Sequence, residues 1–258
     1  MSLKVVLWNV DGTLVETERD GHRVAFNRAF VSCGLPWHWS EARYGELQAL
    51  NSDRERLLRD MVGRPDAPDT ASRRDALARR VRDAKVELYP DLLRHARLPL
   101  RDGVMPLMQE CRAQGVRMVI ATTSSRACVE ALLQFHLGPG WRGWFDALVC
   151  GDHVQCRQPG PEVYVRALLR ARVCPSHAVA IEDSPLGASA ARAVDMPVVL
   201  ARSSYFVNAF FPRVTAIGPG LDQRTGWQPD VQADDAGLAG IRLADIDRWV
   251  AQARRPHA

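Results

Sequence analysis

An alternation of short apolar segments with helical segments, from residue 104 to residue 200, restricts the fold most strongly. Short apolar runs bounded by turn residues indicate buried strands, and amphipathic segments indicate helices. Strands that alternate with helices favour a parallel sheet that helices cover on both faces. We therefore expect an α/β fold with at least five parallel strands. The expected strands are 4–10, 116–121, 147–150, 178–181 and 197–200, with a candidate sixth at 214–217, and the expected helices are 104–114, 125–136, 161–172, 185–194 and 243–252.

A helical insertion follows the first strand directly. Strand signals are absent from residue 16 to about residue 98, and Ser40 is a candidate N-cap within this region. Residues 98–103 are typical of a return loop, and residues 218–237 of a long loop near the C-terminus. We expect a core domain built from 1–16 and 94–258 and a helical cap domain over 17–93. The expected helices of the cap are 16–31, 40–50, 52–62 and 70–87.

Composition and charge are those of an ordinary globular protein. The 258 residues are 47% hydrophobic and 25% charged, with a formal net charge of +4, and this length can bury a sizeable core. Because the arginines are interleaved with acidic residues, we expect no nucleic-acid surface. No run reaches membrane-spanning length, no signal peptide is evident, and the six cysteines lack zinc spacing. We expect a cytoplasmic monomer with buried free thiols and no membrane partner.

The first strand ends in polar residues that are candidates for chemistry. Residues 4–10 are apolar and β-branched, and Asp11-Gly12 follows them with the composition of a sharp turn. In open α/β sheets, ligands bind at the carboxyl ends of the strands. Asn9 and Asp11 lie two residues apart on an extended segment, so we expect their side chains to point in the same direction.

This stretch resembles motif one of the haloacid dehalogenase superfamily, in which an aspartate and one further residue precede Asp-Gly-Thr. In that family the first aspartate attacks a phosphoryl group and the second is the general acid and base. The resemblance gives the second role to Asp11 and puts Asn9 at the position of the nucleophile. Covalent catalysis needs an ionised or activated group, which an amide is not. The resemblance also implies a Rossmannoid core with an inserted C1-type helical cap.

Two later strand ends match further motifs of this family. Thr122 stands where the family has a Ser or Thr that hydrogen-bonds the phosphoryl oxygens, although such a residue also commonly caps a helix. Glu182-Asp183 matches the acidic pair that holds Mg²⁺, a cation that prefers oxygen ligands. The resemblance implies a metal site formed by Asn9, Asp11 and Asp183, with Glu182 in support. Because Asn9 offers only a neutral oxygen, we expect weak or absent Mg²⁺ binding.

Gln158 stands where motif three of the family has a lysine before a proline. That lysine pairs with the nucleophile and screens phosphate charge, so both partners of one ion pair are replaced here, by Asn9 and Gln158. Losing one member of a buried ion pair costs roughly 3–5 kcal/mol, whereas two amides can hydrogen-bond each other. This pattern predicts a compensated, natural loss of the ion pair. Arg157, the preceding residue, is an alternative source of positive charge.

The similarity extends to a bacterial subgroup, the CbbY-type phosphatases that act on xylulose-1,5-bisphosphate. It rests on Glu16-Thr17-Glu18, Trp37–Ser40 and the segment from Asp152 to Tyr164, and it covers about residues 4–201. The subgroup grips a second phosphate with a Thr-Gly-Gly-Lys-Glu-Arg segment, which residues 51–56 replace here without the glycines and with an added Asp53. The substrate-binding residues that this resemblance implies are Glu16, Tyr44, Arg54, Thr123 and Ser124.

Three hypotheses for the function follow. The first is a degenerate family member that binds a small phosphorylated metabolite without transferring its phosphoryl group. The second is an active Mg²⁺-dependent phosphatase with a rearranged or engineered site, in which Asp11 activates water. The third is a non-enzymatic binding or regulatory module that uses Trp37 and Trp39 as anchors. For the two tryptophans, packing of the cap against the core domain is the alternative to that last role.

Overall fold

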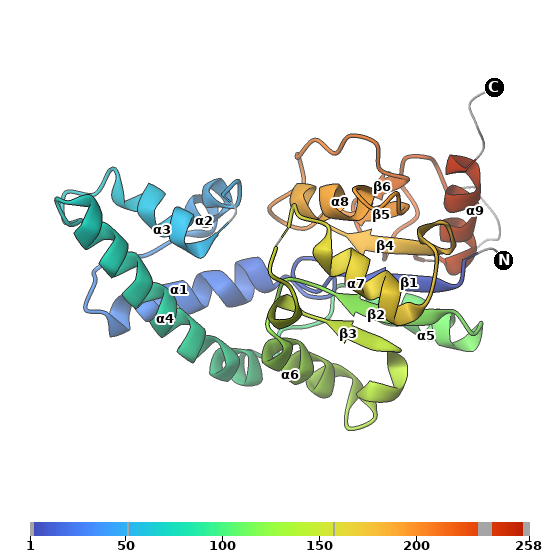
Figure 1. Cartoon of the computed structure of the whole chain (residues 1–258), viewed down its shortest axis with the longest axis horizontal. Coiled ribbons are helices and arrows are strands. Elements are labelled where there is room, and N and C mark those ends of the chain that lie inside the picture. Colours follow the sequence, from blue (N-terminus) through green and yellow to red (C-terminus); the bar gives the residue numbers. More distant parts are fainter. Residues whose placement is uncertain (1–2, 51, 157, 232–238, 255–258) are drawn as a thin grey trace. The chain divides into compact units, whose positions relative to one another are not determined.

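The protein, described by a computed structural model over residues 3–50, 52–156, 158–231 and 239–254, divides into two compact units (Figure 1). The sheet unit comprises Met1–Glu16 and Pro99–Ala258. The helical unit comprises Thr17–Leu98, so it ends a few residues after position 93, where the sequence pattern placed the end of a cap domain.

Among its described residues, the sheet unit contains six strands, β1 (Val5–Trp8), β2 (Arg117–Ala121), β3 (Ala147–Val149), β4 (Ala178–Glu182), β5 (Val198–Ala201) and β6 (Ala216–Gly218). All are parallel, and their order in the sheet is β3-β2-β1-β4-β5-β6. The predicted α/β parallel sheet is therefore confirmed. β1 lies between β2 and β4, and Trp8 aligns with Ile120 and Ile181 at the carboxyl ends of those strands.

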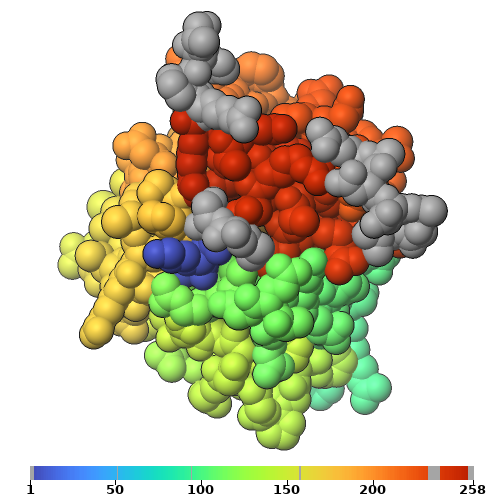
Figure 2. All heavy atoms as spheres, turned by 90° about the vertical axis from the view of Figure 1, so that its right-hand side faces the viewer, coloured from blue at the N-terminus to red at the C-terminus, as the bar shows by residue number. Residues whose placement is uncertain are grey.

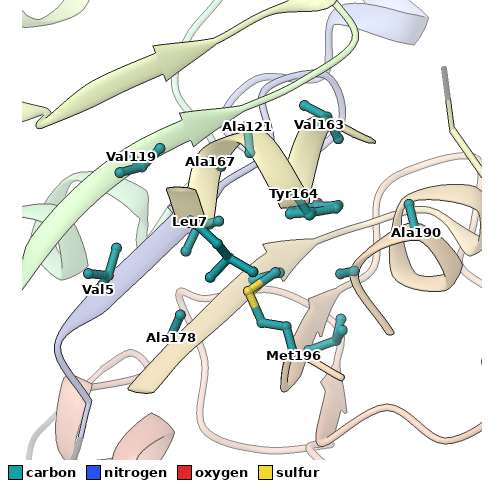
Figure 3. Close-up of a cluster of buried hydrophobic side chains, with 14 of the residues drawn as sticks. Val5, Leu7, Val119, Ala121, Val163, Tyr164, Ala167, Ala178, Ala190 and Met196 are labelled. Atoms are coloured by element: carbon teal, nitrogen blue, oxygen red, sulfur yellow. The ribbon is translucent and has the colours of Figure 1, made fainter. Parts of the chain in front are cut away.

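Helices flank this sheet, and the strands are buried because side chains on both of their faces are covered. On one face, Val5 and Leu7 of β1 meet Val119 of β2 and Tyr164 and Ala167 of a helix (Figure 3). Residues two apart share a face of a strand, which explains this alternation. The helices are α5 (Val104–Ala113), α6 (Arg126–Leu137), α7 (Glu162–Ala171), α8 (Pro185–Arg192) and α9 (Leu243–Ala253), with short 3₁₀ turns η2 (Trp141–Trp144), η3 (Gly151–His153) and η4 (Pro175–His177).

The C-terminal helix α9 packs beside α5, as one face of the molecule shows (Figure 2, red beside green). Glu110 of α5 joins the two, because its carboxylate accepts hydrogen bonds from Arg242 Nε at 2.9 Å and from the Leu243 amide at 3.0 Å. The predicted loop over 218–237 is described only as far as residue 231. In the described part of the chain, no helix is long and apolar enough to span a membrane.

The helical unit contains no strand among its described residues. α4 extends beyond the expected end at residue 87, and Pro90 is accommodated within it. The region predicted as one helix over 16–31 begins with a π-helical turn. Its elements are η1 (Glu18–His22), α1 (Arg23–Ser32), α2 (Glu41–Leu47), α3 (Asp53–Met61) and α4 (Ala71–Ala96).

Trp37 and Trp39 belong to the core of the helical unit, so their predicted role as anchors for a protein partner is wrong. Trp39 is wholly buried against Phe26 and donates a 2.7 Å hydrogen bond to Asp60. Trp37 is 3% exposed and donates to Asp66. Aromatic side chains need to bury their large surface, and their indole N–H groups find acceptors inside the unit.

The prediction for the thiols is only partly correct. All six cysteines are free, but Cys156 and Cys174 are exposed, while Cys111, Cys128 and Cys150 are buried. The first two lie in loops, where an apolar neighbour in the sequence does not ensure burial.

Candidate functional site

The site lies where β1, β2 and β4 end side by side, because parallel strands bring their carboxyl ends to one edge of the sheet. Asn9 follows β1, and its backbone amide still donates to Ile181 of β4 at 3.1 Å. Thr122 follows β2, Glu182 is the last residue of β4, and Asp183 follows it. The sequence therefore brings these four residues together through strand register alone.

The side chain of Asn9 is 7% exposed, and its amide nitrogen lies among oxygens. Nδ2 is 3.0 Å from the Asp11 carbonyl oxygen, 3.1 Å from Asp183 Oδ1 and 3.3 Å from Thr13 Oγ1. The amide thus donates to the loop that follows β1 and to the carboxylate at the end of β4. It ties the two strand ends together without contributing a charge.

Neutral donors surround the carboxylate of Asp183. Thr13 Oγ1 lies 3.2 Å from Oδ1, and Ser203, after β5, donates to Oδ2 at 2.7 Å. Gly12 has φ of +73°, and a Cβ there would meet Oδ2 at 2.0 Å, so only glycine fits this turn. Burial first and the charge of Glu182 second raise the pKa of Asp183 well above its ordinary value.

Glu182 is wholly buried and is also met by neutral groups. Its Oε1 accepts hydrogen bonds from Tyr164 and, at 3.2 Å, from Gln158 Nε2, and its Oε2 accepts from the Asp183 amide at 3.2 Å. Burial raises the pKa of Glu182 to about 7, although the hydrogen bonds from Tyr164 and Gln158 oppose this shift. A Cβ at Gly187 would lie 2.1 Å from this carboxylate, so a glycine allows α8 to approach.

The two amides do not compensate each other in the way that we expected. Asn9 donates to Asp183 and Gln158 donates to Glu182, and no bond joins the two amides among the residues that the structure describes. Each amide instead donates a hydrogen bond to one member of the acidic pair. Arg157, the alternative source of charge, lies outside the described residues.

Asp11 contacts the end of β2. Its Oδ2 accepts a hydrogen bond from Ser124, and the Ser124 amide donates to Thr122 Oγ1 at 3.2 Å. Thr122 is wholly buried, while Asp11, Thr123 and Ser124 are partly exposed. The chain therefore presents a carboxylate and three hydroxyl groups at one strand end, a set that can donate hydrogen bonds to an oxyanion and accept a proton.

Arg101 and Ser203 are site residues that sequence reasoning missed. Arg101 donates to the Gly12 carbonyl and, at 3.1 Å, to the Ala201 carbonyl, and its Nε lies 3.4 Å from Glu16. Its positive charge opposes the rise in the pKa of Asp183. Neither residue belongs to a recognised motif, and the only signal was the position of Arg101 in the predicted return loop.

Glu16 is engaged inside the sheet unit. Besides its contact with Arg101, its carboxylate accepts hydrogen bonds from the Ser204 hydroxyl at 2.8 Å and from the Ser204 amide at 3.2 Å. The role that the resemblance implies for Glu16, binding of sugar hydroxyls, would have to compete with these contacts.

Tyr44 and Arg54 lie in the helical unit, and each side chain has a partner within that unit. Tyr44 is wholly buried and donates a 2.7 Å hydrogen bond to Glu18. Arg54 is exposed and pairs with Asp75 at 2.6 Å. The partner lies on α4, which sequence spacing along α3 could not indicate.

The arrangement around Asn9 does not fit the Mg²⁺ site that the family resemblance implies. Mg²⁺ needs oxygen ligands with free lone pairs, but an N–H₂ group points at the Asp11 carbonyl and at Asp183 Oδ1. The carboxylate of Asp183 accepts from that amide, while Asp11 accepts a hydrogen bond from Ser124 and Glu182 accepts one from Tyr164. Over the described ranges, no group of three His, Cys, Asp or Glu residues is placed to hold a metal ion.

Fold and site together define a hydrolase-like α/β protein, and the chain belongs to the haloacid dehalogenase-like hydrolase family, which it matches over residues 3–195. The CbbY protein of Rhodobacter capsulatus is 36% identical over 205 residues, which cover 80% of this chain and 88% of the relative. Two solved structures of CbbY from Rhodobacter sphaeroides share its fold with a TM-score of 0.71. They are 32% identical and cover 82% of this chain and 92% of CbbY.

One of these CbbY structures contains phosphate, and the other is an aspartate-to-asparagine mutant in complex with xylulose-1,5-bisphosphate. These similarities support the resemblance to the CbbY-like subgroup. The protein is therefore a sugar-phosphate phosphatase-like member of its family.

Proposed function

We propose that this protein binds a small phosphorylated sugar at the carboxyl edge of its sheet and has lost most of the phosphoryl-transfer activity of its relatives. One observation carries the proposal: Asn9 donates its amide protons to Asp11 and Asp183 instead of presenting a carboxylate. An amide cannot act as a nucleophile at neutral pH, and here it also competes with any cation for the same oxygens.

Binding is proposed because the groups that would hold a phosphoryl group are retained. Ser124 places its hydroxyl on Asp11, and Thr122 and Thr123 add two more hydroxyl groups at the same strand end. The CbbY mutant with an asparagine in place of an aspartate was solved with xylulose-1,5-bisphosphate bound, so such an exchange is compatible with ligand binding in a relative. Mg²⁺ is expected to bind weakly, and none of the binding groups just named depends on it.

The experiment is a panel of phosphorylated sugars tested for both phosphate release and thermal stabilisation of the unmodified protein. We expect at least one sugar phosphate to raise the melting temperature, while phosphate release stays at background with and without Mg²⁺. The matched control is Thr122→Val, which keeps the shape of a buried side chain and removes its hydroxyl. Stabilisation that survives Thr122→Val unchanged would place the ligand elsewhere.

Residual phosphatase activity is the second candidate function, and the carboxylate of Asp11 favours it. Asp11 is partly exposed and hydrogen-bonded to Ser124, so it is positioned to take a proton from a water molecule. Phosphate release by the native protein that disappears in Asp11→Asn would support this function over the first.

A further inference from the structure

The carboxyl end of β4 lies between two chain segments that belong to non-adjacent strands. Because β4 separates β1 from β5 in the sheet, the turn after β1 and the segment after β5 approach Asp183 from two sides. The turn contacts its carboxylate through Thr13, whose Oγ1 lies 3.2 Å from Oδ1, and the other segment contacts it through Ser203, at 2.7 Å from Oδ2. The separation of the two segments therefore sets how Asp183 is held.

Arg101 joins these two segments through its guanidinium group. On one side it donates a hydrogen bond to the carbonyl of Gly12, in the turn after β1. On the other side it donates to the carbonyls of Ala201 at 3.1 Å and of Arg202 at 2.5 Å, where β5 ends. Its backbone amide also donates to the Leu14 carbonyl at 2.7 Å. The residue thus ties the turn after β1 to the end of β5, across the end of β4.

An arginine suits this position for a chemical reason. Carbonyl oxygens accept hydrogen bonds and repel one another, and three of them converge on this side chain. A guanidinium group presents five N–H donors in one plane, whereas the ammonium group of lysine is a compact point charge. The side chain of Arg101 is 14% exposed, and its Nε lies 3.4 Å from Glu16. The cation is therefore largely enclosed by the acceptors that it holds together.

We propose that Arg101 is a positioning residue of the site at the carboxyl edge of the sheet. By tying the turn after β1 to the end of β5, it fixes the separation at which Thr13 and Ser203 hold Asp183, and it fixes the turn that presents Asp11 to a ligand. The inference rests on the proposed function for the identity of that ligand, a phosphorylated sugar. The tie itself is made entirely within the sheet unit.

The tie acts on the site through close packing. Gly12 lies so near Asp183 that a Cβ on the glycine would be 2.0 Å from Oδ2, so a small shift of the turn moves the carboxylate. Binding groups need to be held within about 0.5 Å of their productive geometry. The end of β5 lies beyond residues 3–195, the range that the family match covers, so that match does not assign this role to Arg101.

Hydrogen exchange of backbone amides tests the tie without any ligand. The four amides of residues 12–15 donate to carbonyl groups within residues 10–15. We expect Arg101→Ala to lower their protection at least about tenfold relative to the amides of β2 and β4. The matched control is Arg117→Ala, because Arg117 also donates to a backbone carbonyl, that of Ala171 at 2.8 Å, but from the first residue of β2. An equal loss of protection throughout the sheet would show a role in stability alone and would overturn the proposal.

Calorimetry with inorganic phosphate tests the consequence for binding. We expect Arg117→Ala to bind phosphate as native protein does, and Arg101→Ala to bind it at least about tenfold more weakly. Low-millimolar guanidinium chloride, compared with sodium chloride at equal ionic strength, should restore both the affinity and the protection of the turn in Arg101→Ala. Arg101→Lys should be intermediate in both measurements, because a point charge cannot reach the three carbonyls in the geometry of a guanidinium group.

The positioning role and the proposed function fail in different ways. If native protein binds neither phosphate nor any sugar phosphate, the proposed function fails, while hydrogen exchange still decides the role of Arg101. If phosphate binds and Arg101→Ala keeps native affinity and native protection of the turn, the positioning role is wrong. If Arg101→Ala does not fold, Arg101→Lys takes its place, and native values for that variant in both measurements would overturn the proposal.

Discussion

The protein holds carboxylates in two places, which differ in burial and in how the charge is neutralised: Glu182 and Asp183 are almost fully buried, and Asp53 is partly buried. In the sheet unit, Glu182 and Asp183 are met by hydroxyl, amide and backbone N–H groups. In the helical unit, Asp53 is met by an ammonium and a guanidinium group. As a result, the pKa of Glu182 is raised to about 7, whereas the pKa of Asp53 is lowered to about 2.

The comparison shows that positive charge lies beside the carboxylate of the helical unit, whereas neutral groups meet the carboxylates of the sheet unit. Catalysis of phosphoryl transfer consists largely of positioning and of electrostatic stabilisation of the transferring group. The sheet unit has Gln158 where the family resemblance expects a lysine, and Arg101, a cation near Asp183, is held by carbonyl groups and Glu16. In the helical unit, the carboxylate of Asp53 binds two largely buried cations, Lys85 and Arg56.

Restoring charge to the sheet unit should have the largest effect. Asn9→Asp supplies a nucleophile, and Gln158→Lys supplies its counter-charge. Because residues that act as one catalytic unit are strongly non-additive, we expect background turnover for Gln158→Lys, a small rate for Asn9→Asp, and a rate at least about tenfold higher for the pair. Phosphate release from an aryl phosphate with added Mg²⁺ is the measurement.

Two outcomes of that experiment would change the comparison. If native protein released phosphate as fast as the double variant, the result would favour an active enzyme with a rearranged site. An inactive double variant with an intact fold would show that the loss extends beyond these two positions, for example to the residues that hold the sugar.

The second prediction concerns neutralising one acidic residue in each cluster. Asp53→Asn leaves Lys85 without its ion-pair partner and should lower the free energy of unfolding by about 2–4 kcal/mol. Asp183→Asn should change it by less than about 1 kcal/mol, because its carboxylate is met by Asn9, Thr13 and Ser203, and the amide keeps the shape. Urea unfolding at pH 7 measures both, and equal losses would contradict the comparison.

Much of the sheet unit was predictable from the sequence, because strand patterns and register determine what converges. Local periodicity identifies the strands, and their alternation with helices indicates that they run parallel. The convergence of Asn9, Thr122 and Asp183 follows from these two features. The contacts between Arg101 and Glu16 were not predictable, because Arg101 lies in a loop without periodicity. The hydrogen-bond acceptors of the Asn9 and Gln158 side chains also could not be predicted, because they are neighbours in space that spacing along the sequence does not reveal.

The helical unit was harder to predict for a physical reason. Residues three or four apart on a helix can be paired from sequence, but Asp53 and Lys85 lie on different helices, α3 and α4. Arg54, only one residue from Asp53, points to Asp75 instead. Packing between helices decides which charges become buried, and a single sequence gives the faces of the helices without their partners.

The third prediction is a dependence of stability on pH that comes from Glu182. Its pKa rises from the ordinary 4.5 to about 7 on folding, so the folded protein holds a proton that the unfolded chain has lost. The stabilisation is complete below about pH 4.5 and is lost as the pH rises through about 7. Asp183, whose pKa is also raised, acts in the same direction.

Gln158→Lys gives Glu182 a counter-charge and should reduce this loss of stability between pH 5 and pH 8, because a nearby cation favours the ionised carboxyl. Unfolding free energies at the two pH values measure it in native protein and in the variant. An identical pH dependence in both would show that position 158 does not control the charge of Glu182. Asp53 adds nothing to the pH dependence of stability between pH 5 and pH 8, since its pKa is lowered to about 2 and it stays ionised throughout.

The smallest effect is expected for Arg54, the exposed cation of the helical unit. Arg54 is 53% exposed and pairs with Asp75, and exposed ion pairs contribute about 0–1 kcal/mol. Arg54→Ala should therefore lower the free energy of unfolding by less than about 1 kcal/mol, whereas Arg56→Ala removes a buried cation beside Asp53 and should cost more. Affinities for mono- and bisphosphorylated sugars, measured on the same variants, test the phosphate contact that the family resemblance assigns to Arg54. If Arg54 makes such a contact, its loss should weaken the binding of bisphosphorylated sugars specifically. Unchanged affinities for every sugar phosphate in Arg54→Ala would therefore contradict the assignment and leave Arg56 and Lys85 as the cations to consider in this unit.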